Sequence, residues 1–248
     1  MTPFFRKIRK KMADDNRPLK YMRYAFGEII LVVIGILIAL SINNWNQRRS
    51  IKNVEKAILE GIHQDIMNDT IDINYNMGMY RNYLKHASSI LNDLVHKKEK
   101  SDDIVQGIYF LATNDVLLTL HSSKFEEAKQ KGLSIISNST LREKISRLYE
   151  FHYPFVTKIE NDYKGFDYVE LLYPIMGNIF EVDSESIKQN KVIISDKNYN
   201  ALLSDKNLQY KFFEAQIMVK YLLSFYENLS TNRLDVANSI SLELEKFN

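Results

Sequence analysis

The sequence contains no cysteine and little proline or glycine. Its 248 residues include 4 proline and 8 glycine residues, and no proline lies between Leu19 and Tyr153. The absence of cysteine excludes a disulfide framework, thiol chemistry and cysteine metal sites. So few helix-breaking residues over such a length favour long helices. Tyrosine and phenylalanine are plentiful by contrast, with 15 and 13 copies, and can fill a helical core.

Sequence patterns of enzymes and metal sites are also missing. The histidines form no HExxH pattern, and the chain has no P-loop, no dinucleotide-binding glycine motif and no nucleophile elbow. Asp65, Asp69 and Asp72 are spaced to share one helical face. A divalent cation could bridge them, but we expect a solvated acidic surface. We therefore predict no enzymatic activity, no catalytic residues, no cofactor and no bound metal.

One long hydrophobic run is present. Residues 24–42 carry a single charged side chain, Glu28, and every residue from Ile29 to Leu40 is apolar or glycine. As a helix, this run would be about 28 Å long, close to the hydrocarbon thickness of a bilayer. It predicts a membrane-spanning signal-anchor helix over residues 24–45. A cleavable signal peptide with a cleavage site at residues 39–41 is the alternative, but its hydrophobic region would be shorter.

Charge is distributed unequally about this run. Residues 1–23 hold eight lysine or arginine residues against two aspartates, and the chain after the run is slightly acidic. Cytoplasmic segments of membrane proteins are enriched in positive charge, so this basic tail should be cytoplasmic. Attraction to anionic headgroups also explains the tail, and we expect no nucleic acid partner. Four basic residues beyond the run weaken this orientation signal without reversing it: Arg48, Arg49, Lys52 and Lys56.

Small and polar residues within the run suggest how the span anchors and packs. Small residues four apart, such as Gly35 and Ala39, permit close approach of a second helix. Glu28 is costly inside a membrane, and we expect interfacial anchoring or helix pairing rather than proton handling. The amides and the indole at the end of the run have the composition of a headgroup region. The residues predicted for anchoring and packing are Gly27, Glu28, Gly35, Ala39, Asn43, Asn44 and Trp45.

A long helix is predicted after the span. Apolar or aromatic residues recur seven apart from Ile66 to Leu94, with a second set between them. Such spacing over about four heptads is typical of a coiled coil or of one helix in a bundle. We assign residues 46–100 to a helical stalk and residues 101–248 to a soluble helical bundle. The residues predicted for a self-association seam are Ile66, Ile73, Met77, Tyr80, Leu84 and Leu91.

Helix start and stop signals divide the remaining chain. Ser123 with Glu126, and Thr140 with Glu143, have the spacing of capping boxes, and Gly132 fits the end of a helix. The fold class is therefore all-α: one transmembrane helix, a long stalk and a helical bundle. The predicted segments are helices near 102–112, 123–131, 140–152 and 155–173, an extended piece at 192–195, and one or two long helices over 205–247.

Two segments resemble a known bacterial family. FFRKIRKK, followed by GEIILVVIGILIALSINNWN at residues 27–46, is similar to the hallmark of an uncharacterised family of single-pass membrane proteins, catalogued as a domain of unknown function. FEEAKQKGLSIISNSTLREKISRLYEFH, residues 125–152, resembles a second pattern of that family. The resemblance implies a bacterial inner-membrane location with the helical domain in the periplasm. It transfers no activity and no cofactor.

Two functional hypotheses follow. The first is a non-enzymatic periplasmic scaffold or adaptor, anchored in the lipid bilayer, which oligomerises with itself or binds another envelope protein. The alternative is a ligand-sensing helical domain that signals to a membrane partner. An exposed apolar stripe would favour the scaffold, whereas buried, convergent polar groups around a pocket would favour the sensor.

Overall fold

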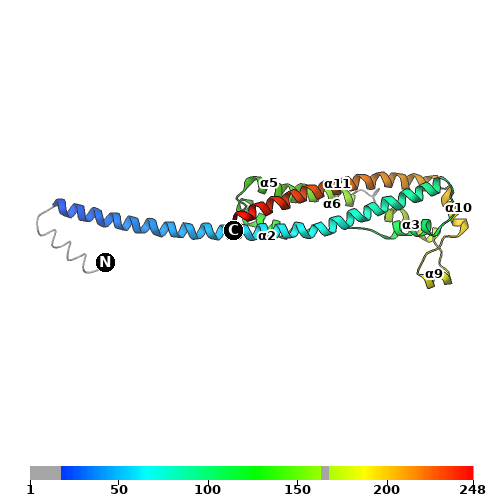
Figure 1. Ribbon diagram of the computed structural model, residues 1–248, viewed down its shortest axis with the longest axis horizontal. Helices are drawn as coiled ribbons and strands as arrows, with labels where there is room; N and C mark the ends of the chain where they lie inside the picture. Colours follow the sequence, from blue (N-terminus) through cyan, green and yellow to red (C-terminus); the bar gives the residue numbers. More distant parts are fainter. Residues whose placement is uncertain (1–17, 163–167, 248) are drawn as a thin grey trace. The chain divides into compact units, whose positions relative to one another are not determined.

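The computed structural model describes residues 18–162 and 168–247, and these residues form an all-α fold (Figure 1). This confirms the all-α class predicted from the sequence. No strand forms within these ranges, and an isolated antiparallel bridge joins Glu181 to Ile193, in the segment predicted to be extended. Most of the predicted basic tail lies outside the described residues. The chain divides into two compact units, residues 1–54 and residues 55–248.

The described part of the first unit is the beginning of helix α2 (Pro18–Val95), which continues into the second unit. Every side chain from Ile29 to Ile42 is exposed. Among the described residues, α2 is the one helix long and apolar enough to cross a membrane, and none of its most apolar stretch is buried. Burial inside the protein therefore does not explain this apolar run.

Helix α2 ends at Val95, five residues before the predicted end of the stalk. Lys97 adopts a left-handed conformation with a φ of 50°, and the backbone N–H of Lys98 donates to the carbonyl of Asp93 at 2.9 Å. Together with the bond from the Lys97 N–H to the Leu94 carbonyl, this is a Schellman motif, which satisfies the last carbonyls of the helix. The helix stops here although no glycine is present.

Three long helical segments build the bundle of the second unit. Figure 1 shows α2 and α11 side by side. Thr70 bonds with Arg233, Asn76 with Tyr226, and Ser88 with Gln216. The residue numbers decrease along α11 as they increase along α2, so the two helices run antiparallel. The third segment, which consists of three consecutive helices, is also antiparallel to α11. These segments are α11 (Lys206–Leu244), α2, and the consecutive helices α5 (Ser139–Arg147), η2 (Leu148–His152) and α6 (Tyr153–Asp162).

The η2 segment is a π-helical turn, and it joins α5 to α6 without a break. Pro154 follows this turn in α6 and cannot donate a backbone hydrogen bond to the turn before it. Such turns occur frequently at functional sites. The remaining short helices are α3 (Asp102–Thr113), α4 (Ser123–Lys131), η1 (Leu133–Ile135), α7 (Tyr168–Leu172), η4 (Tyr173–Ile175), α8 (Met176–Ile179), α9 (Ser184–Gln189), α10 (Asp196–Ser204) and η5 (Glu245–Phe247).

The predicted helix starts are close, but the capping residues are different. Helix α4 follows Ser122, whose side chain makes no capping bond. Helix α5 is capped by Asn138 instead of Thr140, and the Asn138 side chain accepts from the Leu141 N–H at 3.1 Å. Gly132, at a φ of 87°, ends α4 as predicted.

The predicted seam of α2 is largely buried within the second unit. Ile66, Ile73, Met77 and Tyr80 are buried, whereas Leu84 and Leu91 are half-buried. The seven-residue repeat therefore contributes to the core of the chain's own bundle. The self-association predicted for this seam stays a prediction.

The seven-residue repeat of α2 includes Ile66, Ile73, Tyr80 and Ala87. The buried face of the helix also includes the residue that lies three positions after each of these. These positions are more buried than Leu84 and Leu91, and two of them are polar. A polar residue at such a position must find its partners inside the protein. The four residues are Asp69, Asn76, Tyr83 and Ile90.

Candidate functional site

A group of polar side chains lies inside the bundle, where α2, the connection from α3 to α4, the third segment and α11 meet. Asp69 and Arg233 are almost completely buried, with 0% and 1% of their surfaces exposed. Both occupy core-facing helix positions, because Asp69 follows Ile66 by three residues and Arg233 follows Leu229 by four. We call this group the Asp69 cluster; its members are Asp69, His121, Tyr149, Tyr153 and Arg233.

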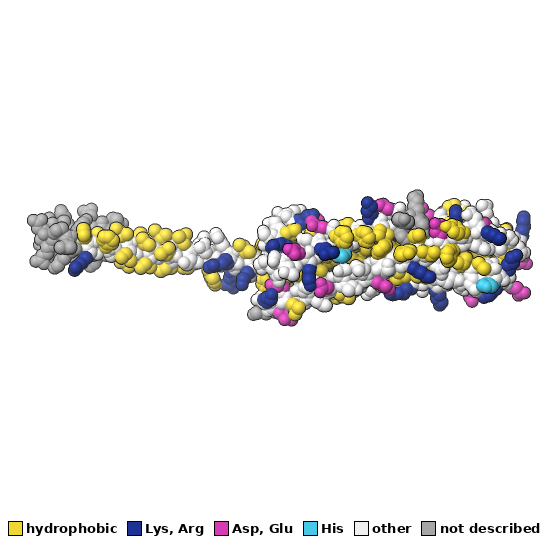
Figure 2. Space-filling view, turned by 90° about the horizontal axis from the view of Figure 1, so that it is seen from above, with side chains coloured by type: hydrophobic (Ala, Val, Ile, Leu, Met, Phe, Trp, Pro, Cys, Tyr) yellow, Lys and Arg dark blue, Asp and Glu magenta, His cyan; other side chains and the backbone are white. Residues whose placement is uncertain are grey.

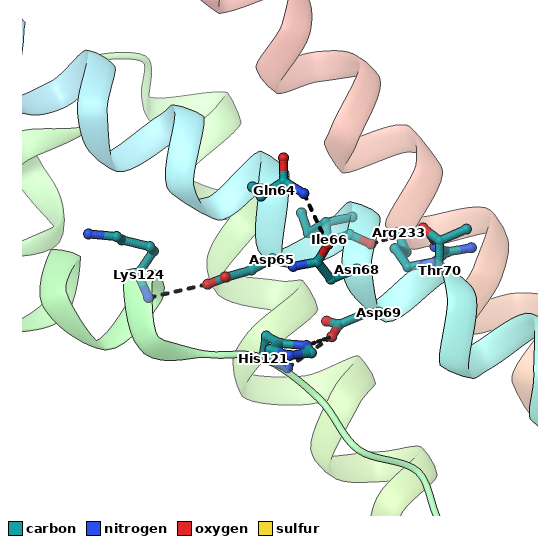
Figure 3. Close-up of polar contacts among 9 residues, drawn as sticks. All are labelled: Gln64, Asp65, Ile66, Asn68, Asp69, Thr70, His121, Lys124 and Arg233. Carbon is teal, nitrogen blue, oxygen red and sulfur yellow. Dashed lines mark hydrogen bonds and ion pairs between the residues drawn. The ribbon is translucent and has the colours of Figure 1, made fainter.

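Asp69 holds the connection that contains His121. One carboxylate oxygen accepts the backbone N–H of His121 at 2.9 Å and lies 2.7 Å from the Nδ1 of its ring (Figure 3). The hydrogen bond to Asp69 raises the pKa of His121, and nearby carboxylates of Asp65 and Asp72 act in the same direction. The His121 side chain is exposed to solvent, so its proton exchanges freely with the medium.

Arg233 enters the cluster from α11. Its guanidinium donates to the hydroxyls of Thr70 and of Ser230, the latter at 3.1 Å. Burial lowers the pKa of Arg233, while the neighbouring Tyr153 and Asp69 oppose this shift. A buried guanidinium is tolerated only with compensating charge and hydrogen bonds, and Asp69 supplies the nearby negative charge.

Four polar atoms of the cluster have no hydrogen-bond partner in the described part of the chain. They are one carboxylate oxygen of Asp69, the hydroxyls of Tyr149 and Tyr153, and the Nε of Arg233. The two rings pack edge to face with their centroids 5.1 Å apart. Burial raises the pKa of both tyrosines, and nearby carboxylates add to the shift, Asp65 and Asp69 for Tyr149 and Asp69 for Tyr153, so both hydroxyls stay protonated. Because buried polar atoms are nearly always hydrogen-bonded, an ordered water is the simplest partner for these atoms.

The predicted solvated acidic face is wrong for Asp69. Asp65 is half-buried and accepts the backbone N–H of Lys124 at 3.3 Å, and Asp72 is also half-buried. Asp69 points into the bundle because the core-facing side of α2 passes through position 69. Among the described residues, no group of three or more histidine, aspartate or glutamate side chains could hold a metal ion.

A second buried network surrounds Glu160 of α6. One oxygen of Glu160 accepts from the hydroxyls of Tyr80 at 2.6 Å and Tyr226 at 2.7 Å, and the other accepts the N–H of Leu118 at 3.2 Å. The side chain of Asn76 donates to the Tyr226 hydroxyl at 3.2 Å. Burial and the Glu160 charge raise the pKa of both tyrosines. These satisfied bonds tie together all three long segments, which makes this network structural.

Apolar and aromatic side chains also line the outer face of α11. Five of them recur at spacings of three and four, and three of the five are exposed. The ring of Phe155 in α6 packs edge to face against Phe225, with the ring centroids 5.4 Å apart. It also stacks on Phe151, with the centroids 5.8 Å apart, so the aromatic surface extends onto the third segment. Figure 2 shows hydrophobic side chains gathered along this side of the bundle. We call the five residues the α11 stripe: Tyr210, Phe213, Ile217, Tyr221 and Phe225.

The residues predicted for anchoring all lie on α2 in the first unit. A Cβ added at Gly27 or Gly35 would meet no atom within 4 Å, so close approach of another helix is sterically open there. The Arg49 guanidinium lies over the exposed Trp45 ring, 5.6 Å from its centroid. Asn43, Asn44 and Ala39 are exposed, and Glu28 is half-exposed.

Comparison with protein families assigns the chain to a group. Residues 28–211 match the family of unknown function DUF6090. The chain belongs to this family. The match covers residues 28–46 of the first resembling segment and all of residues 125–152, whereas FFRKIRKK and Gly27 lie outside it. No curated protein and no solved structure matches the chain.

Sequence reasoning missed the Asp69 cluster. His121, the pair Tyr149 and Tyr153, and Arg233 come from three distant parts of the sequence, and no known motif links them. The available signal is a polar residue at a core-facing position. Asp69 and Asn76, seven apart on the seam helix, meet this criterion, and both bond to other elements of the bundle.

Proposed function

We propose that the chain is a single-pass protein of the bacterial inner membrane whose periplasmic helical unit is a scaffold or adaptor for another envelope protein. In this proposal the chain has no enzymatic activity of its own. The α11 stripe is the observation that carries the proposal. Exposed apolar stripes of this kind favour docking, and aromatic residues often dominate interface energetics.

Membrane anchoring is supported by the exposed apolar stretch of α2. A soluble protein would have to bury these side chains, and an apolar helix of this length suits a bilayer. The eight basic residues among residues 1–23 favour a cytoplasmic N-terminus by the positive-inside rule. The second unit would then lie in the periplasm.

The stripe favours one kind of partner. It extends for about 22 Å along α11, the length of a helix of four turns. Three lysines on α11 flank it, Lys206, Lys211 and Lys220, and one acidic residue, Glu214, lies on its face. The matching partner is an envelope protein that presents an apolar helix face with acidic residues at its edges.

Purification from native membranes in mild detergent tests this proposal. We expect the wild-type chain to retain one envelope protein in constant proportion, and the double variant Phe213→Ser/Tyr221→Ser to lose it. The control is Leu117→Ser/Ile187→Ser, which changes two exposed apolar residues outside the stripe. A partner retained equally by all three proteins, or absent from all, would contradict docking through the stripe.

Ligand sensing is the second candidate, and the unpartnered atoms of the Asp69 cluster favour it. A polar small molecule bound there would join α2, α11 and the third segment. Mass analysis of small molecules released from the denatured full-length protein would test this function. A compound present in the wild type and lost in Asp69→Asn would support sensing, and its absence from both would leave water as the guest and reject sensing at this cluster.

A further inference from the structure

The segment directly after the apolar run has a strong positive charge. Arg48, Arg49 and Lys52 are exposed on α2 and follow Trp45. Figure 2 shows Lys and Arg side chains gathered beside the end of the apolar stretch. We call these three cations, together with Trp45, the basic collar.

The basic collar lies on one side of the helix. Each residue turns an α-helix by about 100°, so the four residues fall within an arc of about 100°. The opposite side carries no charge in this turn, since it presents Gln47, Ile51 and Val54. The collar is therefore a directed cationic surface and not an even ring of charge.

Within the part of the chain that the structure describes, no ion pair neutralises these cations. Between Ala25 and Val54 the sequence has one acidic residue, Glu28, about 30 Å before the collar along the helix. No ion pair joins Arg48, Arg49 or Lys52 to any acidic residue in the described ranges. Exposed lysines of the second unit often have such partners, such as Lys191 with Asp102 at 2.7 Å.

Three uncompensated cations at this end of a span also oppose the positive-inside rule, so another interaction must favour them there. Guanidinium groups match phosphate oxygens with two parallel hydrogen bonds, and an indole prefers the headgroup region. We propose that the basic collar binds the phosphate groups of anionic lipids in the leaflet at the C-terminal end of the span. This inference rests on the proposed membrane anchoring.

The collar contains the only tryptophan of the chain, which makes Trp45 a built-in reporter. The full chain is reconstituted in phosphatidylcholine vesicles that contain a small fraction of dansyl-labelled lipid, either phosphatidylglycerol or phosphatidylcholine. Energy transfer from Trp45 to each label gives the exchange constant for anionic over zwitterionic lipid at the collar. The variant is Arg48→Gln/Lys52→Gln, which keeps Arg49 in contact with the indole.

We expect the wild type to prefer the anionic lipid, and this preference to fall by about fivefold for each cation removed at low salt. Added salt should weaken the wild-type preference because it screens exposed charges. The control variant Lys188→Gln/Lys197→Gln removes two exposed cations from α9 and α10 and should keep the full preference.

Three results would overturn the inference. They are a wild type without lipid preference, a collar variant with unchanged preference, or an equal loss in the control variant of α9 and α10. Flotation of the same vesicles distinguishes the absence of a lipid preference from the absence of membrane anchoring. A chain that floats with phosphatidylcholine vesicles but shows no anionic preference is anchored without a lipid-binding collar, whereas a chain that never floats rejects the anchoring itself.

Discussion

Asp69 is completely buried, and its charge compensates that of Arg233 inside the bundle. We predict that Asp69→Asn lowers the free energy of unfolding of the second unit by about 3 kcal/mol, because an uncompensated guanidinium is then left buried. Chemical denaturation of the full-length protein in detergent, followed by circular dichroism, measures this change. The double variant Asp69→Asn/Arg233→Met should lose far less or far more stability than the sum of the losses in the two single variants. Additive losses would mean that the two charges do not interact.

His121 should make the stability of the second unit depend on pH. Its pKa is raised in the folded state by the bond to Asp69, so the folded form binds the proton more tightly. The stabilisation is present below the unfolded pKa of about 6.5 and disappears as the pH rises through the higher folded pKa.

The comparison with His121→Gln isolates this effect. Burial lowers the pKa of His86 and His152, which gives them the opposite pH dependence in both proteins. We expect the stability difference between wild type and His121→Gln to shrink as the pH rises above neutrality. A difference that is constant from acidic to alkaline pH would show that protonation of His121 does not stabilise the fold.

At the residue scale, the sequence identified which residues of α2 are apolar but not where the centre of its buried face lies. The repeat Ile66, Ile73 and Tyr80 is buried as a bundle seam requires. Position 69 was assigned to solvent because aspartate is usually exposed. Its burial depends on His121 and Arg233, which approach from distant parts of the chain, and no local pattern encodes that approach.

Asn138 shows at the element scale how one cap can fix a helix end. Its side chain accepts from the Leu141 N–H and donates to Glu243 at 2.6 Å, which joins α5 to α11. We predict that Asn138→Ala costs about 1–2 kcal/mol of unfolding free energy. Thr140→Ala is the matched control and should change stability by less than about 0.5 kcal/mol, since Thr140 is exposed. Equal costs, measured by thermal unfolding, would contradict the assignment of the cap.

Most elements could be predicted because they carry strong local signals. Helices α3, α4 and α11 begin and end near the predicted residues, and Gly132 ends α4. Helices α9 and α10 were missed. Each has fewer than ten residues, and the capping box of α9 pairs Asp183 with Ser186 instead of the usual glutamate. Short polar helices of this kind depend on caps and tertiary contacts more than on periodicity.

At the scale of the whole molecule, the apolar run of α2 must enter a bilayer for the proposed function to hold. Two arginines at its centre, in Ile34→Arg/Leu37→Arg, should cost about 5–7 kcal/mol of insertion free energy. We expect this variant to be released from membranes by alkaline carbonate, while the wild type stays in the pellet. Ile51→Arg places a charge just beyond the run and should leave the protein in the pellet. Release of the wild type under the same conditions would refute the anchoring.

The whole-molecule properties that follow from composition were accessible from the sequence. The all-α class follows from scarce proline and glycine, and the apolar run is visible without any structure. The α11 stripe was not separable from the core positions of α11, because both sets are apolar and recur at helical spacing. Only the packing of α2 and α6 against α11 determines which of its faces is left exposed.

Site-specific photocrosslinking is the direct test of whether an envelope protein docks on the α11 stripe. A photoreactive phenylalanine analogue replaces Tyr221 in the stripe or, as a control, Ile187 on α9, both of which are exposed. After irradiation of intact cells, we expect one dominant adduct from position 221 that contains a single envelope protein, and none from position 187. Adducts only between copies of this chain, or the same adducts from both positions, would contradict it.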